Sequence, residues 1–294
     1  MSNTTRGFSL IELLMALLIT AALSAMMFQL FHQNERVMRD QTLITEMQQT
    51  ARIVASQIAD EVRMAGQGVP IYASSFDTAA SEAIAAILPS STASRIDFRS
   101  SLSNVETAAT SPGPIDVELG VSRPFYVADG SLFPNGKFVY VSGPSTSSAW
   151  SWVRAELTNA GSAALTLVPR ETGAGGTIIH FNAPPIIFLE EAVSIYLSGT
   201  SVRRATANDM ANPANPTWSA ANEIGKNFTA LNFTYYDMMG NVVTTASLAN
   251  RQSVARVDIN LTVETASALA DGSRPTYSLA LRTIPRNLRL RPAN

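Results

Sequence analysis

Residues 6–31 read RGFSLIELLMALLITAALSAMMFQLF and contain the longest apolar stretch of the chain. Residues 13–31 are 19 positions without a charged side chain. As an α-helix they would extend about 28 Å, close to the roughly 30 Å hydrocarbon thickness of a bilayer. The preceding segment is polar and carries one basic residue, Arg6. We therefore expect one membrane-spanning helix with its N-terminus in the cytoplasm.

Glu12 lies within this apolar stretch, close to its start. An ionised carboxylate inside a bilayer is costly unless a cation pairs with it. Two interpretations follow. Either the side chain reaches the headgroup layer from the end of the span, or it has a function inside the membrane.

A cleaved secretory signal peptide is an alternative, with Ala22 and Ser24 as small residues near a cleavage site. The apolar run, however, continues through Met26, Phe28 and Phe31, and helical periodicity continues after it. A signal peptide needs neither feature, so the sequence favours a retained helix.

The stretch Arg6-Gly7-Phe8-Ser9-Leu10-Ile11-Glu12-Leu13-Leu14 resembles the prepilin cleavage and methylation motif of type IV pilins and type II secretion pseudopilins. In that family a short basic leader ends in Gly, a membrane peptidase cuts after it, and the new N-terminal residue is methylated. The resemblance implies cleavage between Gly7 and Phe8 and N-methylation of Phe8. Removal of residues 1–7 would leave 287 of the 294 residues.

The same resemblance implies a role for Glu12, which becomes the fifth mature residue. In the family this carboxylate is thought to meet the N-terminal amine of a neighbouring subunit. A buried carboxylate and a buried ammonium are each costly alone and far less costly together. We expect Glu12 to set the axial register of the filament, with the apolar helices packed in its core.

The helix is expected to continue into water, from about residue 9 to residue 64. No Gly lies between Gly7 and Gly66, and the first Pro is Pro70. After residue 31 apolar residues recur mostly three and four positions apart, at Val37, Ile44, Met47, Ala51, Val54 and Ile58. This stripe is expected to pack on a β domain of the same chain; a coiled-coil stalk is the alternative.

Two later segments resemble a subgroup, the PilW-type minor pilins and the J-type minor pseudopilins. Residues 63–66, Arg-Met-Ala-Gly, resemble the end of their helix. Residues 223–241 resemble a segment in which a helical turn leads into a strand and an Asp…Gly turn. Residues 71–190 match no motif and are longer than expected for a J-type pseudopilin.

The rest of the chain predicts mainly strands. Runs rich in Val, Ile, Phe and Tyr alternate with turn residues, and a short helix is expected at 81–88. Residues 205–222 are expected to form a loop, and a hairpin is expected around Gly199. The predicted strands are 95–99, 115–119, 125–128, 137–142, 152–157, 164–169, 178–181, 186–188, 192–197, 201–204, 251–263 and 277–284.

These elements predict an α+β, type IV pilin-like fold, with a long N-terminal helix packed on an antiparallel, β-rich C-terminal domain. The expected division is a leader at 1–7, a transmembrane or filament-core half of the helix at 8–31, an amphipathic half at 32–66, and a periplasmic globular domain at 67–294.

Composition argues against a chemical role. The chain has no Cys and two His, which excludes thiolate sites and disfavours a His-based metal cluster or triad. Its formal net charge is −2, so no global basic field attracts nucleic acid. Asp237 with Asn241, the Glu190-Glu191 pair and His180 are interpreted as a turn, divergent side chains and a strand residue. We expect no catalytic residue, no metal and no cofactor.

The resemblance therefore implies a minor pilin that helps to prime filament assembly, near the tip of the filament. Its expected partners are other pilins, the prepilin peptidase, the inner-membrane assembly platform and, before assembly, the bilayer. It is expected in the inner membrane first and then in the periplasm or the cell-surface pilus. The alternatives are a J-type pseudopilin of type II secretion, or a membrane-anchored periplasmic protein that binds or modifies a ligand.

Overall fold

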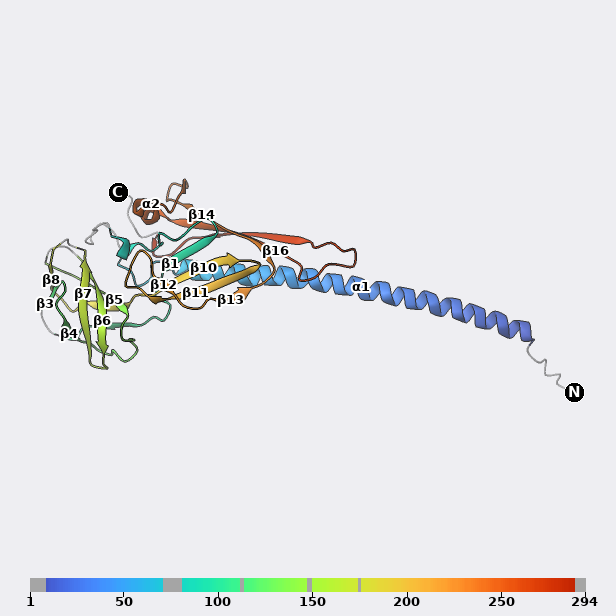
Figure 1. Ribbon diagram of the computed structural model, residues 1–294, viewed down its shortest axis with the longest axis horizontal. Helices are drawn as coiled ribbons and strands as arrows, with labels where there is room; N and C mark the ends of the chain where they lie inside the picture. Colours follow the sequence, from blue (N-terminus) through green and yellow to red (C-terminus); the bar gives the residue numbers. More distant parts are fainter. Residues whose placement is uncertain (1–8, 71–80, 112–113, 147–149, 174–175, 289–294) are drawn as a thin grey trace.

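The computed structural model describes residues 9–70, 81–111, 114–146, 150–173 and 176–288. A single long helix, α1 (Leu10–Arg63), projects from a β-rich head, and the start of this helix lies at the opposite end of the described molecule from that head (Figure 1). Its 54 residues correspond to about 80 Å. The helix ends where Gly66 adopts a φ of 82°, a conformation that favours glycine. The predicted helix boundaries are confirmed to within one residue.

Two antiparallel sheets pack against the C-terminal part of α1, and we call this unit the helix lobe. One sheet has the order β1-β10-β11-β12, with β13 also paired to β11, and the other has the order β15-β14-β16-β17. The bounds are β1 (Arg95–Arg99), β10 (Ala192–Ser198), β11 (Ser201–Asp209), β12 (Thr217–Trp218), β13 (Asn222–Gly225), β14 (Phe228–Tyr236), β15 (Val242–Val243), β16 (Arg256–Glu264) and β17 (Thr276–Thr283).

The core of the helix lobe forms where the apolar stripe of α1 meets these sheets. Ala51, Val54 and Ile58 are buried, together with Ile96 and Phe98 of β1 and alternate residues of β14 and β16. Alternation along β16 places Val257, Ile259, Leu261 and Val263 on the buried face. The expectation that the stripe packs on a β domain of the same chain is therefore confirmed, although Val37 is exposed.

A second unit, residues 100–191, forms a barrel. Its six-stranded sheet has the order β2-β9-β5-β6-β7-β4. The two edges meet at an Ala109–Val127 bridge, where the Thr110 amide donates to the Tyr126 carbonyl at 2.8 Å. The strands are β2 (Glu106–Ala108), β4 (Arg123–Tyr126), β5 (Phe138–Gly143), β6 (Ser151–Ala160), β7 (Ala164–Thr172) and β9 (Ile186–Leu189), and a further pair is β3 (Ile115–Glu118) with β8 (Ile178–Phe181).

The barrel is inserted into a sheet of the helix lobe. The chain leaves β1 at Arg99 and returns in β10 at Ala192, and these two residues are Cα partners across the two strands. Every residue of β5 is buried, because one face fills the barrel and the other faces the helix lobe. Val139 and Val141 belong to the barrel core, whereas Tyr140 belongs to the core of the helix lobe.

The fold class is confirmed, with a long apolar helix followed by antiparallel β structure, but several local predictions were wrong. The short helix expected at 81–88 is only a 3-10 turn, η1 (Glu82–Ile84), because residues 85–88 run extended and Ile87 bridges to Phe98. The loop expected at 205–222 contains the end of β11 and all of β12.

Two further corrections concern the C-terminal part of the chain. The helical turn expected at the start of residues 223–241 is the strand β13, which pairs with β11. Residues 251–253, expected to begin a strand, lie in a short helix, α2 (Leu248–Ser253). In the first place, pairing with the neighbouring strand β11 decides the structure. In the second place, the capping residue Ser247, whose side chain accepts from the Asn250 amide, favours a helix.

Candidate functional site: the exposed half of α1

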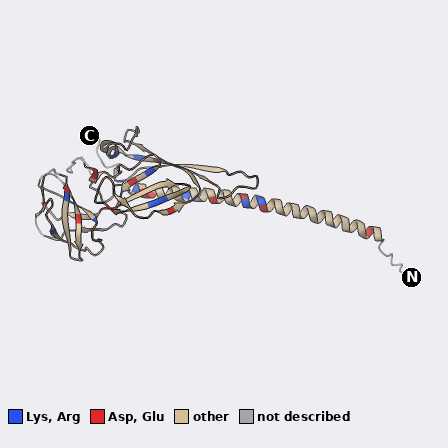
Figure 2. Ribbon diagram, viewed as in Figure 1, with Lys and Arg blue, Asp and Glu red and all other residues tan. Residues whose placement is uncertain are grey.

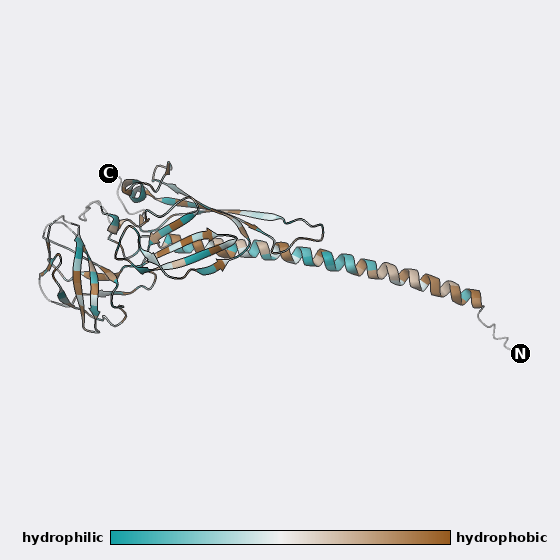
Figure 3. Ribbon diagram, viewed as in Figure 1, coloured by the Kyte–Doolittle hydropathy of each residue, from teal (hydrophilic) through white to brown (hydrophobic). Residues whose placement is uncertain are grey.

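The N-terminal half of α1 makes no packing contact with the head. Every described residue from 9 to 39 is exposed, including large apolar side chains such as Leu18 and Phe28. Figure 3 shows the outer part of this half, which we call the rod, as mostly hydrophobic, with a hydrophilic stretch between it and the head. An exposed apolar surface of this extent marks a contact with lipid or with other proteins. The helix is long and apolar enough to cross a membrane.

Glu12 is the only ionisable residue between positions 9 and 31 of the sequence. Figure 2 shows its isolated acidic band near the start of the helix, far from the charged residues of the head. Within the described part of the chain, no ion pair involves its carboxylate. Among its described residues, the structure therefore presents one carboxylate without an ion-pair partner on a rod that is otherwise uncharged.

A polar segment separates this rod from the head. It begins at His32, whose ring lies 3.8 Å from the Glu35 carboxylate. It ends near Asp40, where both carboxylate oxygens lie 3.2 Å from the Ala270 amide in the loop between β16 and β17. Of α1, only the part beyond this contact belongs to the helix lobe.

The helix end is held by charge as well as by packing. The Arg204 Nε atom of β11 donates to both carboxylate oxygens of Glu61, at 2.7 and 2.9 Å. The Arg286 amide donates to the Arg63 carbonyl at 3.1 Å. The residues Arg-Met-Ala-Gly at 63–66 thus form the junction between α1 and the head.

The predicted processing residues Gly7 and Phe8 lie outside the described residues, and Glu12 lies on the exposed rod. The other sequence candidates have local roles. Asp237 accepts from the amides of Met239 and Asn241, at 2.9 and 2.8 Å. Together with the Asn241 side chain, these bonds hold the pKa of the Asp237 carboxyl below its usual value. His180 lies on β8, 2.7 Å from the Asp116 carboxylate.

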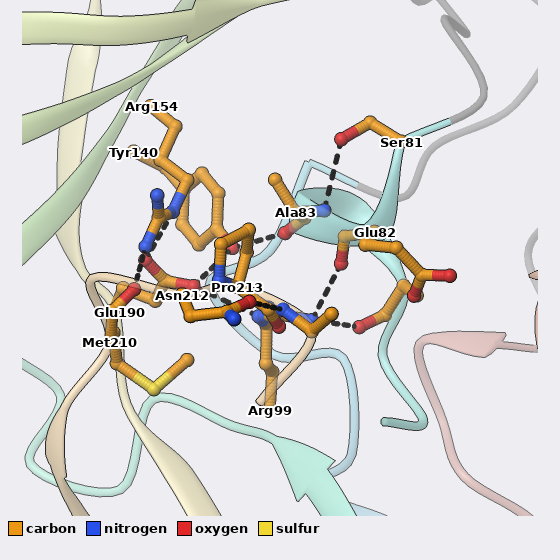
Figure 4. A network of polar contacts seen from close by, with 12 residues as sticks. Ser81, Glu82, Ala83, Arg99, Tyr140, Arg154, Glu190, Met210, Asn212 and Pro213 are labelled. Carbon is orange, nitrogen blue, oxygen red and sulfur yellow. Dashed lines mark hydrogen bonds and ion pairs between the residues drawn. The ribbon is translucent and has the colours of Figure 1, made fainter. Parts of the chain in front are cut away.

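Glu190 and Glu191 diverge, as the sequence predicted, but the environment of Glu190 was not foreseen. Its carboxylate is buried and accepts from Arg99 Nε at 2.9 Å and from Arg154 Nε at 2.7 Å. The Tyr140 hydroxyl lies 2.9 Å from the same carboxylate and also bonds the Ala83 carbonyl (Figure 4). We call Arg99, Tyr140, Arg154 and Glu190 the buried cluster.

The protonation states in the buried cluster follow from its surroundings. Burial alone lowers the pKa of the Arg99 guanidinium, but the charge of the Glu190 carboxylate and its hydrogen bond raise that pKa above its usual value. Burial and the charge of Glu190 raise the pKa of Tyr140, so its hydroxyl stays protonated and remains a donor. Two guanidinium groups thus share one carboxylate inside the molecule.

The described part of the head holds a pocket whose charged side chains already have partners. A pocket of about 210 Å³ lies beside β14 and β16 and is lined by Asp237, Met238, Gly240, Ala255, Arg256 and Ile284. Its two charged side chains have partners within the protein. Asp237 bonds its own turn, and the Arg256 guanidinium stacks 3.7 Å from the centre of the Tyr236 ring.

Comparison with known proteins identifies a sequence motif at the N-terminus. Residues 2–28 match the model of the prokaryotic N-terminal methylation motif. The chain has a prepilin-type N-terminus. This match includes Gly7, Phe8 and Glu12 and confirms the resemblance read from the sequence. The PilW-type subgroup is not confirmed by it.

Two further comparisons complete this result. A type IV-like pilin from Thermus thermophilus is similar in structure over 53% of this chain and 87% of that chain, at 12% identity and a TM-score of 0.24. Among curated proteins there is no significant match. The prepilin-type N-terminus and the apolar rod behind it fit membrane anchoring and support a pilin or pseudopilin.

Proposed function

We propose that the chain is a minor pilin of a type IV pilus, a structural subunit that acts by packing and not by catalysis. The observation that carries the proposal is that a prepilin-type motif and an exposed apolar rod occur together at the start of the chain. The single carboxylate of this rod, Glu12, has no ion-pair partner among the described residues. Burial of that rod in a filament requires a cation for Glu12, and the methylated amine of a neighbouring Phe8 is the group that prepilin processing creates.

The barrel supports a position near the tip. It lies beyond the C-terminal end of α1, on the side of the head away from the rod (Figure 1). Where helices stack along a common axis, a subunit added above this one needs the space that the barrel occupies. At the end of a filament no subunit lies above this one, so the barrel meets no steric overlap. Only a few copies per filament are needed for such a position.

In this proposal the chain is inserted in the inner membrane with its leader in the cytoplasm. The prepilin peptidase removes residues 1–7, and the assembly platform then passes the subunit to other pilins. The head stays in the periplasm until the filament carries it outward.

The mature N-terminus tests the first step. We expect mass spectrometry of the chain purified from its own cells to give 287 residues that begin with N-methylated Phe8. The same chain from cells without prepilin peptidase should keep all 294 residues. An unmethylated chain that begins at Met1 in wild-type cells would contradict the proposal. Immunogold labelling of purified pili then separates the positions, with label at filament ends for a tip subunit and along the length for a shaft subunit.

A further inference from the structure

The barrel joins the helix lobe through a narrow neck of two chain crossings, at residues 99–100 and 190–191. The Ser100 amide donates to the Glu191 carbonyl at 3.1 Å, and the Glu190 amide donates to the Phe138 carbonyl of β5 at 2.8 Å. Both of these bonds lie within residues 100–191. Between the two units, the Ser101 amide donates to the Gln67 carbonyl at 2.9 Å, and Tyr140 and Trp152 of the barrel strands pack into the core of the helix lobe.

The neck also rests on the end of α1. The Gly66 amide donates to the Arg99 carbonyl at 2.8 Å, and the Ser100 hydroxyl donates to the Met64 carbonyl at 3.0 Å. Gly68 has a φ of 74°, and a Cβ atom there would lie 2.8 Å from the Ser101 Cβ. The helix end and the first crossing are thus in direct contact.

The buried cluster spans this neck and draws on both units. Arg99 is the last residue of β1 in the helix lobe. Tyr140 and Arg154 are Cα partners on the adjacent barrel strands β5 and β6, and Glu190 lies at the second crossing. Glu190 accepts from Arg99 on one oxygen and from Arg154 on the other. Figure 4 shows both guanidinium groups directed at this one carboxylate.

A segment of the helix lobe closes over the cluster. After β11 the chain passes across the neck, and the Met210 and Pro213 carbonyls accept from Arg154 and Arg99 respectively. Arg99 also donates to the carbonyls of Glu82, at 2.9 Å, and Ala85, at 2.6 Å. The Arg154 guanidinium further stacks on Phe138, 4.1 Å from the ring centre.

These contacts make the cluster sensitive to the loss of its carboxylate. Arg99, Arg154 and Glu190 are all buried, so two positive charges depend on one negative charge. Removal of one partner from a buried ion cluster leaves uncompensated charge and is far more costly than loss of a surface pair. An open neck would let water reach both guanidinium groups.

We propose that the buried cluster is a lock that fixes the orientation of the barrel relative to α1. With the lock closed, a position imposed on the helix in a filament also sets the position of the barrel. With the lock broken, each unit keeps its paired strands, but the barrel pivots about the neck and draws Tyr140 and Trp152 away from the core of the helix lobe.

The absence of Cys allows a direct test on the full-length chain in detergent micelles. Cysteines placed at Ile53, 66% exposed on α1, and at Leu132, 72% exposed on the barrel, carry spin labels whose separation is measured by pulsed electron resonance. We call this doubly labelled protein, without further substitutions, the parent. We expect it to give one narrow distribution of distances between the two labels. Glu190→Gln should lose the narrow peak and give a broad one.

A matched control is Glu156→Gln, which removes the same charge from the exposed Arg170 pair on the barrel surface and should leave the distribution narrow. Hydrogen exchange then separates a pivot from unfolding. In Glu190→Gln, the amide of Ser101, which donates to the Gln67 carbonyl of the helix lobe, should exchange about a hundredfold faster or more, while amides of β6 and β7 keep their protection.

A narrow distribution in a folded Glu190→Gln protein, or a broad one in the parent, would overturn the proposal. If Glu190→Gln also loses protection in β6 and β7, Arg154→Met decides. That variant keeps the charge-balanced Arg99–Glu190 pair and removes the contacts of Arg154 with Glu190 and with the Met210 carbonyl of the helix lobe. A broadened distribution in folded Arg154→Met supports the lock, and an unchanged one rejects it.

Discussion

The two ends of α1 are both rich in apolar residues, but their surroundings are opposite. Residues 10–31 expose their side chains all round, whereas residues 47–63 bury one face between two sheets. Glu12 in the first part has no ion-pair partner among the described residues, whereas Glu61 in the second part is held by Arg204. One continuous helix therefore carries two kinds of information: its C-terminal part specifies the fold of the chain, and its N-terminal part specifies contacts with other molecules.

The largest expected effect concerns the C-terminal part of α1, which packs in the core of the head. Ile58 is 0% exposed and Ile53 is 66% exposed, five residues away on the same helix. Ile58→Ala should lower the free energy of unfolding of the head by about 2–5 kcal/mol, because it leaves a cavity in the core. Ile53→Ala should change it by no more than about 0.5 kcal/mol.

Denaturant unfolding followed by intrinsic fluorescence measures both variants. Trp152 is buried in the core of the helix lobe and reports the transition. Equal effects of the two substitutions would show that this part of α1 is not packed as described.

The second effect concerns the assembly-bearing part. Glu12→Gln should leave membrane insertion and head stability unchanged but lower incorporation into filaments by about tenfold or more, because a buried N-terminal ammonium would lose its counter-charge. Glu35→Gln changes the same charge on the exposed polar segment and should have little effect. Quantitative immunoblots of sheared pili and of membranes measure the ratio. Normal incorporation of the Glu12 variant would show that its carboxylate does not guide assembly.

A third, smaller effect sharpens the contrast between the two helix carboxylates. Glu61→Gln should cost about 1 kcal/mol of head stability, because the pair with Arg204 is only partly shielded from water. Its effect on incorporation should be no greater than that loss of folded protein explains. The readout is the denaturant midpoint of the head, compared with pilus incorporation in the same strain. A strong assembly defect at unchanged stability would mean that Glu61 also contacts other subunits.

Local patterns were sufficient to predict α1 and most strands. Helix-breaking residues are absent between Gly7 and Gly66, and the alternation of residues 257–263 depends only on neighbouring positions. Strand β2 was missed because its three residues carry no pattern, and its pairing with β9 defines it. The barrel was missed because its closure depends on the Ala109–Val127 bridge, which no local signal marks.

The same reason explains which candidate residues the sequence could indicate. Gly7, Phe8 and Glu12 lie within one short motif that resembles a known family, and their individual roles stay predictions. Arg99 and Glu190 lie 91 positions apart, and nothing in either local sequence indicates that they meet. Adjacent glutamates predicted divergent side chains, which is correct, but not that one of them would be enclosed by two arginines.

The insertion of the barrel between β1 and β10 has a consequence for how such subunits diversify. Because Arg99 and Ala192 are paired across adjacent strands, a short reverse turn would join them without disturbing the sheet. The sheet can thus carry an inserted unit of another size at the outer end of the molecule. Any replacement must bring a carboxylate for Arg99, while α1 stays unchanged.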